Sequence, residues 1–336
     1  APLRKHPAKE SKVGFDALLR ILRVSADDID SYELHKRSID ARKRNDIVLI
    51  LTYHVSLKGG PAAEQKLLSK IQGKPIAKHI KPAEPNTFTL PKATKPVPSE
   101  NRPVVVGAGC AGLFCALTLA QAGLNPLLIE RGDDATRRTA AVEHHNQTGQ
   151  LDLESNVQFG LGGAGTFSDG KLNTQVRDPL GRNRFVLETL AACGAPQEIL
   201  IDAKPHIGTD ILVLVMRNLR QKIIDLGGSF RFQTRMTRPL IREGRIEGLY
   251  FRGESSSDRE EEFLPCSRLV LAIGHSARDS FETLYKEQVP MEAKPFALGF
   301  RVEHPQKMID DSQYGKTSRP PVPASYKLAR SLPGRR

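Results

Sequence analysis

The stretch Pro103–Arg131, PVVVGAGCAGLFCALTLAQAGLNPLLIER, decides the fold that we predict for this chain. Its pattern predicts a buried strand at 103–106, a helix at 111–122 and a second strand at 126–129. Between the first strand and the helix, Gly107, Gly109 and Gly112 form G-x-G-x-x-G. In such a unit the first glycine allows a tight turn. The second lets the backbone approach a pyrophosphate, and the third lets the helix pack closely.

The second strand ends at an acidic residue, Glu130, which lies 23 positions after Gly107. An acid at this place accepts hydrogen bonds from the ribose hydroxyls of an adenine dinucleotide, and the helix N-terminus holds the diphosphate. We therefore predict an α/β, Rossmann-like dinucleotide-binding domain, with cofactor contacts that include Ala111 in the first turn of the helix.

Two later segments favour FAD over NAD. The strand predicted at 268–274, RLVLAIG, ends in Ala272 and Gly274, whose small size lets the backbone pass under a cofactor. The glycine-rich segment Gly160–Lys171 is suited to wrap a phosphate or a ribityl chain with backbone N–H groups. Although its end resembles a nucleoside-triphosphate loop, Leu172 stands where a Mg²⁺-binding hydroxyl is required, which excludes an ATPase.

The sequence predicts three parts. Residues 1–80 form a small α+β, ferredoxin-like module, with helices at 14–24 and 61–71, extended segments at 32–39 and 47–57, and a charged turn at 40–46. Residues 81–102 form a proline-rich linker. Residues 103–336 form the FAD-binding domain (103–131 and about 205–284) with an inserted substrate region (about 132–204 and 285–336). Within that domain we expect a helix at 210–226, a strand at 230–236, a hairpin at 239–251 around Glu243-Gly244 and a polar excursion at 253–262.

The net charge of +12 is uneven, because residues 1–102 carry 20 Lys and Arg against 11 Asp and Glu, a net +9. We favour a solvated basic surface as the explanation. The alternative is an RNA-associated flavoprotein that docks on nucleic acid through this module, with binding that weakens as salt rises.

Four cysteines, Cys110, Cys115, Cys193 and Cys266, show no disulfide or C-x-x-C spacing, which fits a reducing compartment. No apolar run approaches the roughly 18 residues that span a membrane. We expect a cytoplasmic protein, or an organellar one if a targeting segment has been removed. The histidines lack ligand-like spacing, so we predict no metal.

Four polar residues are candidate catalytic groups: Lys204, His206, His275 and Arg278. Such groups steer hydride and proton transfer by charge and hydrogen bonding. The alternative is that they are ordinary loop residues beside a helix cap at Ser276.

Six motifs together resemble the family of uncharacterised FAD-dependent, NAD(FAD)-utilising dehydrogenases. They are VVVGAGCAGLFCALTLAQAG…ER, ESNVQFGLGGAGTFSDGKL, GAPQEIL, KPHIGTD, LAIGHSARDSF and MEAKPFALGFRVEHPQ…ID. The resemblance implies a glutathione-reductase-type FAD domain. It places the pyrophosphate at Gly107, Gly109 and Gly112, the ribose at Glu130, the flavin near Gly163, Gly165 and Gly274, and the adenine against the strand through Met236. Arg131, next to Glu130, is a further candidate cofactor contact.

The resemblance also implies that relatives continue past Arg336, so we expect this chain to be C-terminally truncated. The function that we predict is an FAD-dependent oxidoreductase that transfers a hydride between a small organic substrate and the flavin. NAD(P) is a candidate transient co-substrate. A non-catalytic dinucleotide-binding scaffold is a further alternative.

Overall fold

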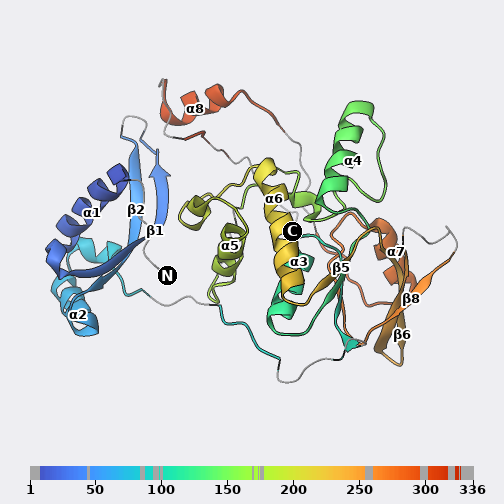
Figure 1. The fold of residues 1–336 in the computed structure, drawn as a ribbon. Coiled ribbons are helices and arrows are strands. Elements are labelled where there is room, and N and C mark those ends of the chain that lie inside the picture. The colour runs from blue at the N-terminus through green and yellow to red at the C-terminus, as the bar shows by residue number, and fades with distance from the viewer. Residues whose placement is uncertain are drawn as a thin grey trace. The chain divides into compact units, whose positions relative to one another are not determined.

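The computed structural model describes residues 8–43, 46–83, 88–93, 98, 101–168, 170–172, 174, 178–253, 260–295, 302–316, 322–324 and 326 (Figure 1). By its internal contacts the chain divides into two compact units. The first comprises 1–83, 201–203 and 293–336, and the second comprises 84–200 and 204–292. The functional domain boundaries given above stay predictions. Much of the predicted linker at 81–102 lies outside the described residues.

The first unit is built on an antiparallel pair of strands. Its elements in chain order are α1 (Ala8–Leu22), β1 (Ile29–Asp40), β2 (Val48–Leu57), α2 (Gly60–Ile71) and α8 (Gln306–Tyr314). Leu22, Ile29 and Leu57 form its buried centre, against which the apolar positions of the predicted first helix pack. The α+β character is therefore confirmed.

The ferredoxin-like detail differs from what the structure shows in the described residues. A ferredoxin-like unit alternates four strands with two helices, whereas here the order is α1-β1-β2-α2 and the sheet has two strands. The free edge of β1 pairs briefly with residues 201–203. Arg37 N donates to Ile201 O, and Ala203 N donates to Arg37 O.

The second unit contains a parallel sheet in the order β5-β4-β3-β9. Its strands are β3 (Val104–Val106), β4 (Leu127–Ile129), β5 (Ser229–Arg231) and β9 (Leu269–Leu271). Its helices are α3 (Cys110–Gln121), α4 (Ala135–Thr148), α5 (Arg182–Ala192), α6 (Thr209–Asp225) and α7 (Arg278–Lys286). The β3-α3-β4 unit lies where the glycine pattern predicted it, and the Rossmann-like α/β fold is confirmed.

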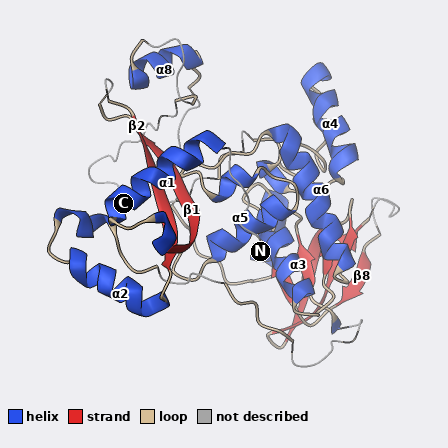
Figure 2. Ribbon diagram, turned by 60° about the vertical axis from the view of Figure 1, so that its left-hand side comes forward, coloured by secondary structure: helices blue, strands red, loops and turns tan. Residues whose placement is uncertain are grey.

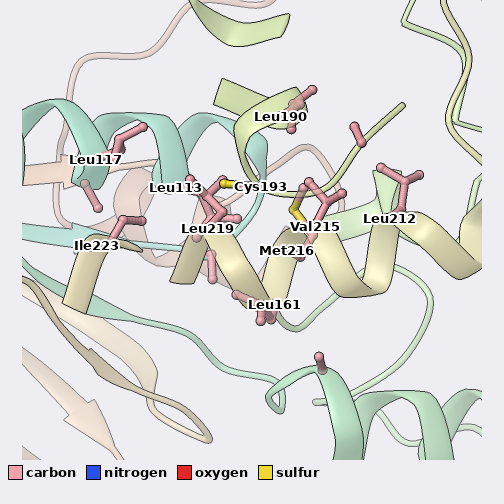
Figure 3. Close-up of a cluster of buried hydrophobic side chains, with 14 of the residues drawn as sticks. Leu113, Leu117, Leu161, Leu190, Cys193, Leu212, Val215, Met216, Leu219 and Ile223 are labelled. Atoms are coloured by element: carbon pink, nitrogen blue, oxygen red, sulfur yellow. The ribbon is translucent and has the colours of Figure 1, made fainter. Parts of the chain in front are cut away.

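The residues of β3 and β4 alternate between the two faces of the sheet, as strand geometry requires. Val105 and Leu128 face the helices α3 and α6, which lie side by side (Figures 1 and 2). Figure 3 shows apolar side chains of these two helices packed together, among them Leu113, Leu117 and Leu219. Both strands are buried on two sides, which explains their unbroken apolar runs.

The opposite face of the parallel sheet packs against an antiparallel sheet of β6 (Arg235–Arg242), β7 (Arg245–Arg252) and β8 (Glu262–Pro265). The predicted hairpin is confirmed, because Glu243 and Gly244 both have positive φ in the two-residue turn between β6 and β7. The sequence missed β8, and residues 254–259 of the predicted polar excursion lie outside the described residues.

The single strand predicted at 230–236 is wrong. The chain leaves the parallel sheet after β5 and enters the antiparallel sheet at β6, and Gln233 between them has φ +50°. Gln233 N donates to Gly132 O and Thr234 N donates to Glu130 O. These bonds to the segment after β4 fix the bend, which brings Thr234–Met236 beside the end of that strand.

Candidate functional site

The glycines of the turn after β3 differ in what surrounds them. Gly107 has φ +103°, and a Cβ there would overlap the Ala272 carbonyl oxygen. A Cβ on Gly112 would overlap the Gly107 carbonyl oxygen, so α3 approaches the turn closely only because this position lacks a side chain. At Gly109 a Cβ would meet only the Gly163 Cα, at 3.8 Å. Protein packing thus demands glycine at two of the three positions and leaves the space above Gly109 open.

The N-terminus of α3 provides donors next to this open space. Gly109 caps the helix, and the first hydrogen bond of this turn runs from Leu113 N to Gly109 O. The N–H groups of the three residues before Leu113 lie in the first turn, where a helix offers no acceptors of its own. Cys110 and Ala111 are exposed, so an anion can reach this end of the helix.

The second glycine-rich segment packs directly on the turn. Gly162 N donates to Ala108 O at 2.8 Å, and a Cβ on Gly163 would lie 2.8 Å from the Gly109 Cα. The structure therefore joins two glycine loops that are about fifty residues apart in the sequence. We call residues 107–112 and 160–165 together the glycine cradle.

Glu130 lies at the centre of this arrangement and is 5% exposed. Its Oε2 accepts from Ala108 N at 2.6 Å, and its Oε1 accepts from Gly132 N and Gly160 N, both at 2.9 Å. A carboxylate offers about four lone-pair sites, so one remains for a ligand. The predicted ribose contact stays a prediction, and the geometry leaves room for one hydroxyl rather than two.

A pocket opens at the carboxyl ends of β3, β4 and β9, and residues at the end of or after each of these strands line it. The sheet order places it at the point where the strand sequence reverses, between β3 and β9, which is where open α/β sheets bind ligands. Its walls combine apolar groups with a few polar ones. They are Val106, Gly107, Glu130, Arg131, Phe159, Thr234, Arg235, Met236, Ile273, Ala277 and Ser280.

Charged side chains at the pocket form a compensated network. Arg131 donates to both oxygens of Asp279, at 3.0 and 2.9 Å, and to Glu154 at 2.8 Å. Arg235 donates to Glu154 at 3.0 Å, and the Arg131 guanidinium lies 4.3 Å from the centre of the Phe159 ring. Burial raises the pKa of Asp279, but the hydrogen bonds and positive charge of Arg131, with smaller contributions from the Ser280 backbone N–H and the charge of Arg235, together lower that pKa below its ordinary value. Two cations and two anions thus hold each other in place.

The other predicted cofactor residues lie around the same edge. Met236 is buried in the pocket wall, and Ala272 N donates to Val106 O, which extends the pairing of β9 with β3 by one residue. Gly274 follows with φ +71° and is exposed, as is Gly165 in the cradle. Their contacts with a cofactor stay predictions.

The four predicted catalytic residues are all exposed, and none lines the pocket. His206 lies beside Lys171 in a short bridge that ends the second glycine loop, and its neighbour Pro205 accepts from Leu172 N. His275 follows Gly274, and Arg278 begins α7 between the pocket residues Ala277 and Ser280. A catalytic role for these residues stays a prediction.

The sequence analysis placed Asp279 among the polar residues after β9 but missed its ion-pair partner, and it missed Arg138 altogether. Asp279 pairs with Arg131 across 148 positions, and Arg138 is fully buried beneath the second glycine loop. Nothing in the local sequence marks Arg138 as buried, because its neighbour Arg137 is the same residue type and its side chain is 58% exposed.

Within the described part of the chain, no group of three or more histidine, cysteine or acidic side chains is placed to hold a metal ion. The described helices include none that is both long and apolar enough to cross a bilayer. The four cysteines are free thiols.

Three segments match known family models. Residues 105–168 match an NAD(P)-binding Rossmann-like domain. The chain contains a Rossmann-like dinucleotide-binding domain. Residues 295–336 match the model "FAD-dependent protein, C-terminal domain-like", and residues 3–56 match a domain of unknown function (DUF8436).

An uncharacterized protein of Clostridium beijerinckii is 44% identical over 310 residues, which is 91% of this chain and 54% of that protein. The chain therefore spans about half the length of this curated relative. Among solved structures, THI4 of Thermovibrio ammonificans has a TM-score of 0.38 at 17% identity, covering 56% of this chain and 62% of its own. The 3-ketosteroid-delta4-(5alpha)-dehydrogenase of Rhodococcus jostii has a TM-score of 0.33 at 16% identity, covering 55% and 48%.

Proposed function

We propose that this chain binds FAD in the glycine cradle and the adjoining pocket, as part of an oxidoreductase. The observation that carries the proposal is the open space above Gly109, bounded by the N-terminus of α3 and the second glycine loop. The match of residues 295–336 to a model of FAD-dependent proteins supports FAD over NAD as the resident cofactor.

The residues present fit such a cofactor. The pocket offers an apolar wall at Met236 and Ile273 for an adenine ring and one free acceptor site on Glu130 for a ribose hydroxyl. The backbone donors at the start of α3 suit a diphosphate. Arg131 and Arg235 are already paired with acids, so they add no net charge that would select a further phosphate on the ribose.

Bound flavin would supply a two-electron acceptor for a hydride. In our proposal, His275 and Arg278 hold a substrate by charge and hydrogen bonding at the end of β9, and Lys204 and His206 do so from the segment before α6. The substrate is a small organic molecule, and NAD(P) is the proposed transient co-substrate. Because the chain spans about half of its relative, the complete reaction belongs to this proposal as well.

The decisive experiment is the visible spectrum of the purified protein, followed by titration of the cofactor-free form with FAD and, separately, with NAD. We expect flavin bands and one FAD per chain. A colourless protein that binds NAD and ignores FAD would overturn the proposal.

Gly109→Glu provides the matching variant. It places a carboxylate in the space left for the diphosphate, so we expect loss of FAD binding without unfolding, because a side chain there meets only Gly163. Gln147→Glu is the control, since it adds the same group at an exposed position of α4. Normal flavin content in Gly109→Glu would contradict the assignment.

A further inference from the structure

Arg138 in α4 is 0% exposed, and in the described part of the chain it donates to three backbone carbonyl oxygens. Its Nε donates to Asn156 O at 2.9 Å, one Nη donates to Leu161 O at 2.6 Å and the other to Gly163 O at 2.9 Å. Burial lowers the pKa of Arg138 to about 10, while the nearby Glu130 acts to raise it. The guanidinium is therefore charged at neutral pH.

Residues 156–167, which contain the second glycine loop (160–165), fold around the Arg138 side chain. A Cβ on Gly160 would overlap the Arg138 Cδ, and the guanidinium lies 4.8 Å from the centre of the Phe167 ring. The segment from Asn156 to Phe167 thus wraps a charged group at its centre. A buried charge is costly unless its donors are satisfied. Moving these carbonyl oxygens away from the guanidinium would therefore cost free energy, which holds the loop in place.

Glu130 holds the same loop through a backbone N–H group rather than through carbonyl oxygens. It accepts from Gly160 N, while Arg138 donates to the carbonyl oxygens on either side, at Asn156 and Leu161. Glu130 also accepts from Ala108 N in the first glycine loop. The two charged residues therefore fix the second loop relative to the first.

The position of Gly163 is the consequence that matters for binding. Its carbonyl oxygen is held by Arg138, and its Cα faces Gly109 at the open side of the cradle. A loop with three glycines at 160, 162 and 163 has many accessible backbone conformations when nothing restrains it. Restraining it before the cofactor arrives reduces the entropy lost on binding.

We propose that Arg138 is a positioning residue, which holds the second glycine loop in its binding conformation so that the cradle is formed before FAD enters. This rests on the proposed function for the identity of the cofactor. The restraint of the loop by Arg138 does not depend on the proposed function, because it concerns the cofactor-free chain. Arg138 acts through loop carbonyl oxygens and need not touch the cofactor.

The test measures amide hydrogen exchange in the cofactor-free protein for peptides covering residues 156–167, and FAD binding in the same variants. In Arg138→Met three charge-assisted hydrogen bonds are lost, so we expect the loop amides to lose most of their protection against exchange. If the formed loop falls to about 1–10% of the population, FAD affinity should fall about 10- to 100-fold, because only that fraction is competent to bind. Peptides from α5 and α6 should exchange as in the wild type. Arg137→Met removes the neighbouring exposed guanidinium and should leave the exchange of the loop unchanged.

Two further variants guard against a general folding defect. Arg138→Lys keeps the charge but not the planar fork, so we expect intermediate exchange and affinity. Arg138→Ala should recover loop protection and FAD affinity on addition of guanidinium at non-denaturing concentrations, and sodium chloride at equal strength should not restore them. Such rescue would assign the effect to the guanidinium itself, whereas a general folding defect predicts that Arg138→Met also raises exchange in α5 and α6.

Unchanged loop exchange in both Arg138→Met and Arg138→Lys would overturn the proposal. So would a loosened loop whose FAD affinity matches the wild type. A wild-type protein that binds no FAD would remove the proposed function, and the exchange experiment would still decide whether Arg138 restrains the loop.

Discussion

Replacing Glu130 by glutamine tests how much the cradle depends on one carboxylate. The change keeps the shape of the side chain and removes its charge. The amide oxygen can still accept from Gly132 N and Gly160 N, which share one oxygen in the wild type. The amide nitrogen then faces Ala108 N, so two donors oppose each other at a residue that is 0% exposed.

The magnitude follows from these contacts. A buried backbone donor left unpaired costs about 1–3 kcal/mol, and two charge-assisted hydrogen bonds that become neutral lose about 1 kcal/mol each. We therefore expect Glu130→Gln to reduce the free energy of unfolding by about 3–5 kcal/mol. A domain is typically stable by about 5–15 kcal/mol, so the variant should fold but with a clearly lower midpoint.

The assay is urea-induced unfolding followed by circular dichroism, on cofactor-free protein so that bound ligand does not mask the change. Glu282→Gln is the control, because the Glu282 side chain is 67% exposed and forms an ion pair with Lys286 on the same helix. Such a pair contributes about 0.3–0.5 kcal/mol. If Glu130→Gln lies within 1 kcal/mol of the wild type, the three backbone bonds are not what holds the cradle together.

Three further predictions follow from single contacts. Asp279→Asn should cost about 1 kcal/mol at neutral pH by removing a partly exposed bidentate pair with Arg131. Because the native pKa of Asp279 is lowered, that difference in unfolding midpoint should shrink as the pH falls below about 4, and a difference that grows there would contradict the pairing. Burial raises the pKa of Cys266 to about 11, against a backbone hydrogen bond from Arg268 that lowers it, so mass spectrometry after thiol labelling at pH 8 should find Cys266 modified only in denaturant. Gly112→Ala should reduce the free energy of unfolding by about 1–3 kcal/mol through overpacking and so lower the thermal midpoint. Gly165→Ala should leave the midpoint unchanged, because a Cβ there would meet only the Cys110 Sγ, at 3.7 Å. Equal midpoints for the two variants would show that α3 can shift.

The parts of the fold that the sequence predicted correctly are those set by residues close in the chain. The β3-α3-β4 unit follows from two short apolar runs, a small-residue helix and glycines at the turn. The β6–β7 hairpin follows from Glu243-Gly244, because a two-residue turn of this kind requires positive φ at both positions. In each case the cause and the structure lie within about thirty residues.

The errors arose where distant segments decide the local structure. The run from Phe230 to Met236 has the composition of one strand, but backbone bonds to Gly132 and Glu130 bend it into two. Arg137 and Arg138 are indistinguishable in sequence, and only the folding of the loop 156–167 over α4 buries one of them. Periodicity cannot report a contact whose partner is a backbone carbonyl twenty residues away.

The spacing of Glu130 from the first glycine predicted an acid at the end of β4, and the structure gives that acid a second reason to be there. Its carboxylate joins backbone N–H groups from three segments, those of Ala108, Gly132 and Gly160. Arg138 likewise donates to backbone carbonyl oxygens, and Arg131 is neutralised by Glu154 and Asp279. The charges nearest the cradle are therefore engaged in building it. In the proposed function, the neutral N–H groups at the start of α3 are then the groups that would face the diphosphate, so the placement of the glycine backbone, rather than a cationic side chain, would decide whether this site holds one.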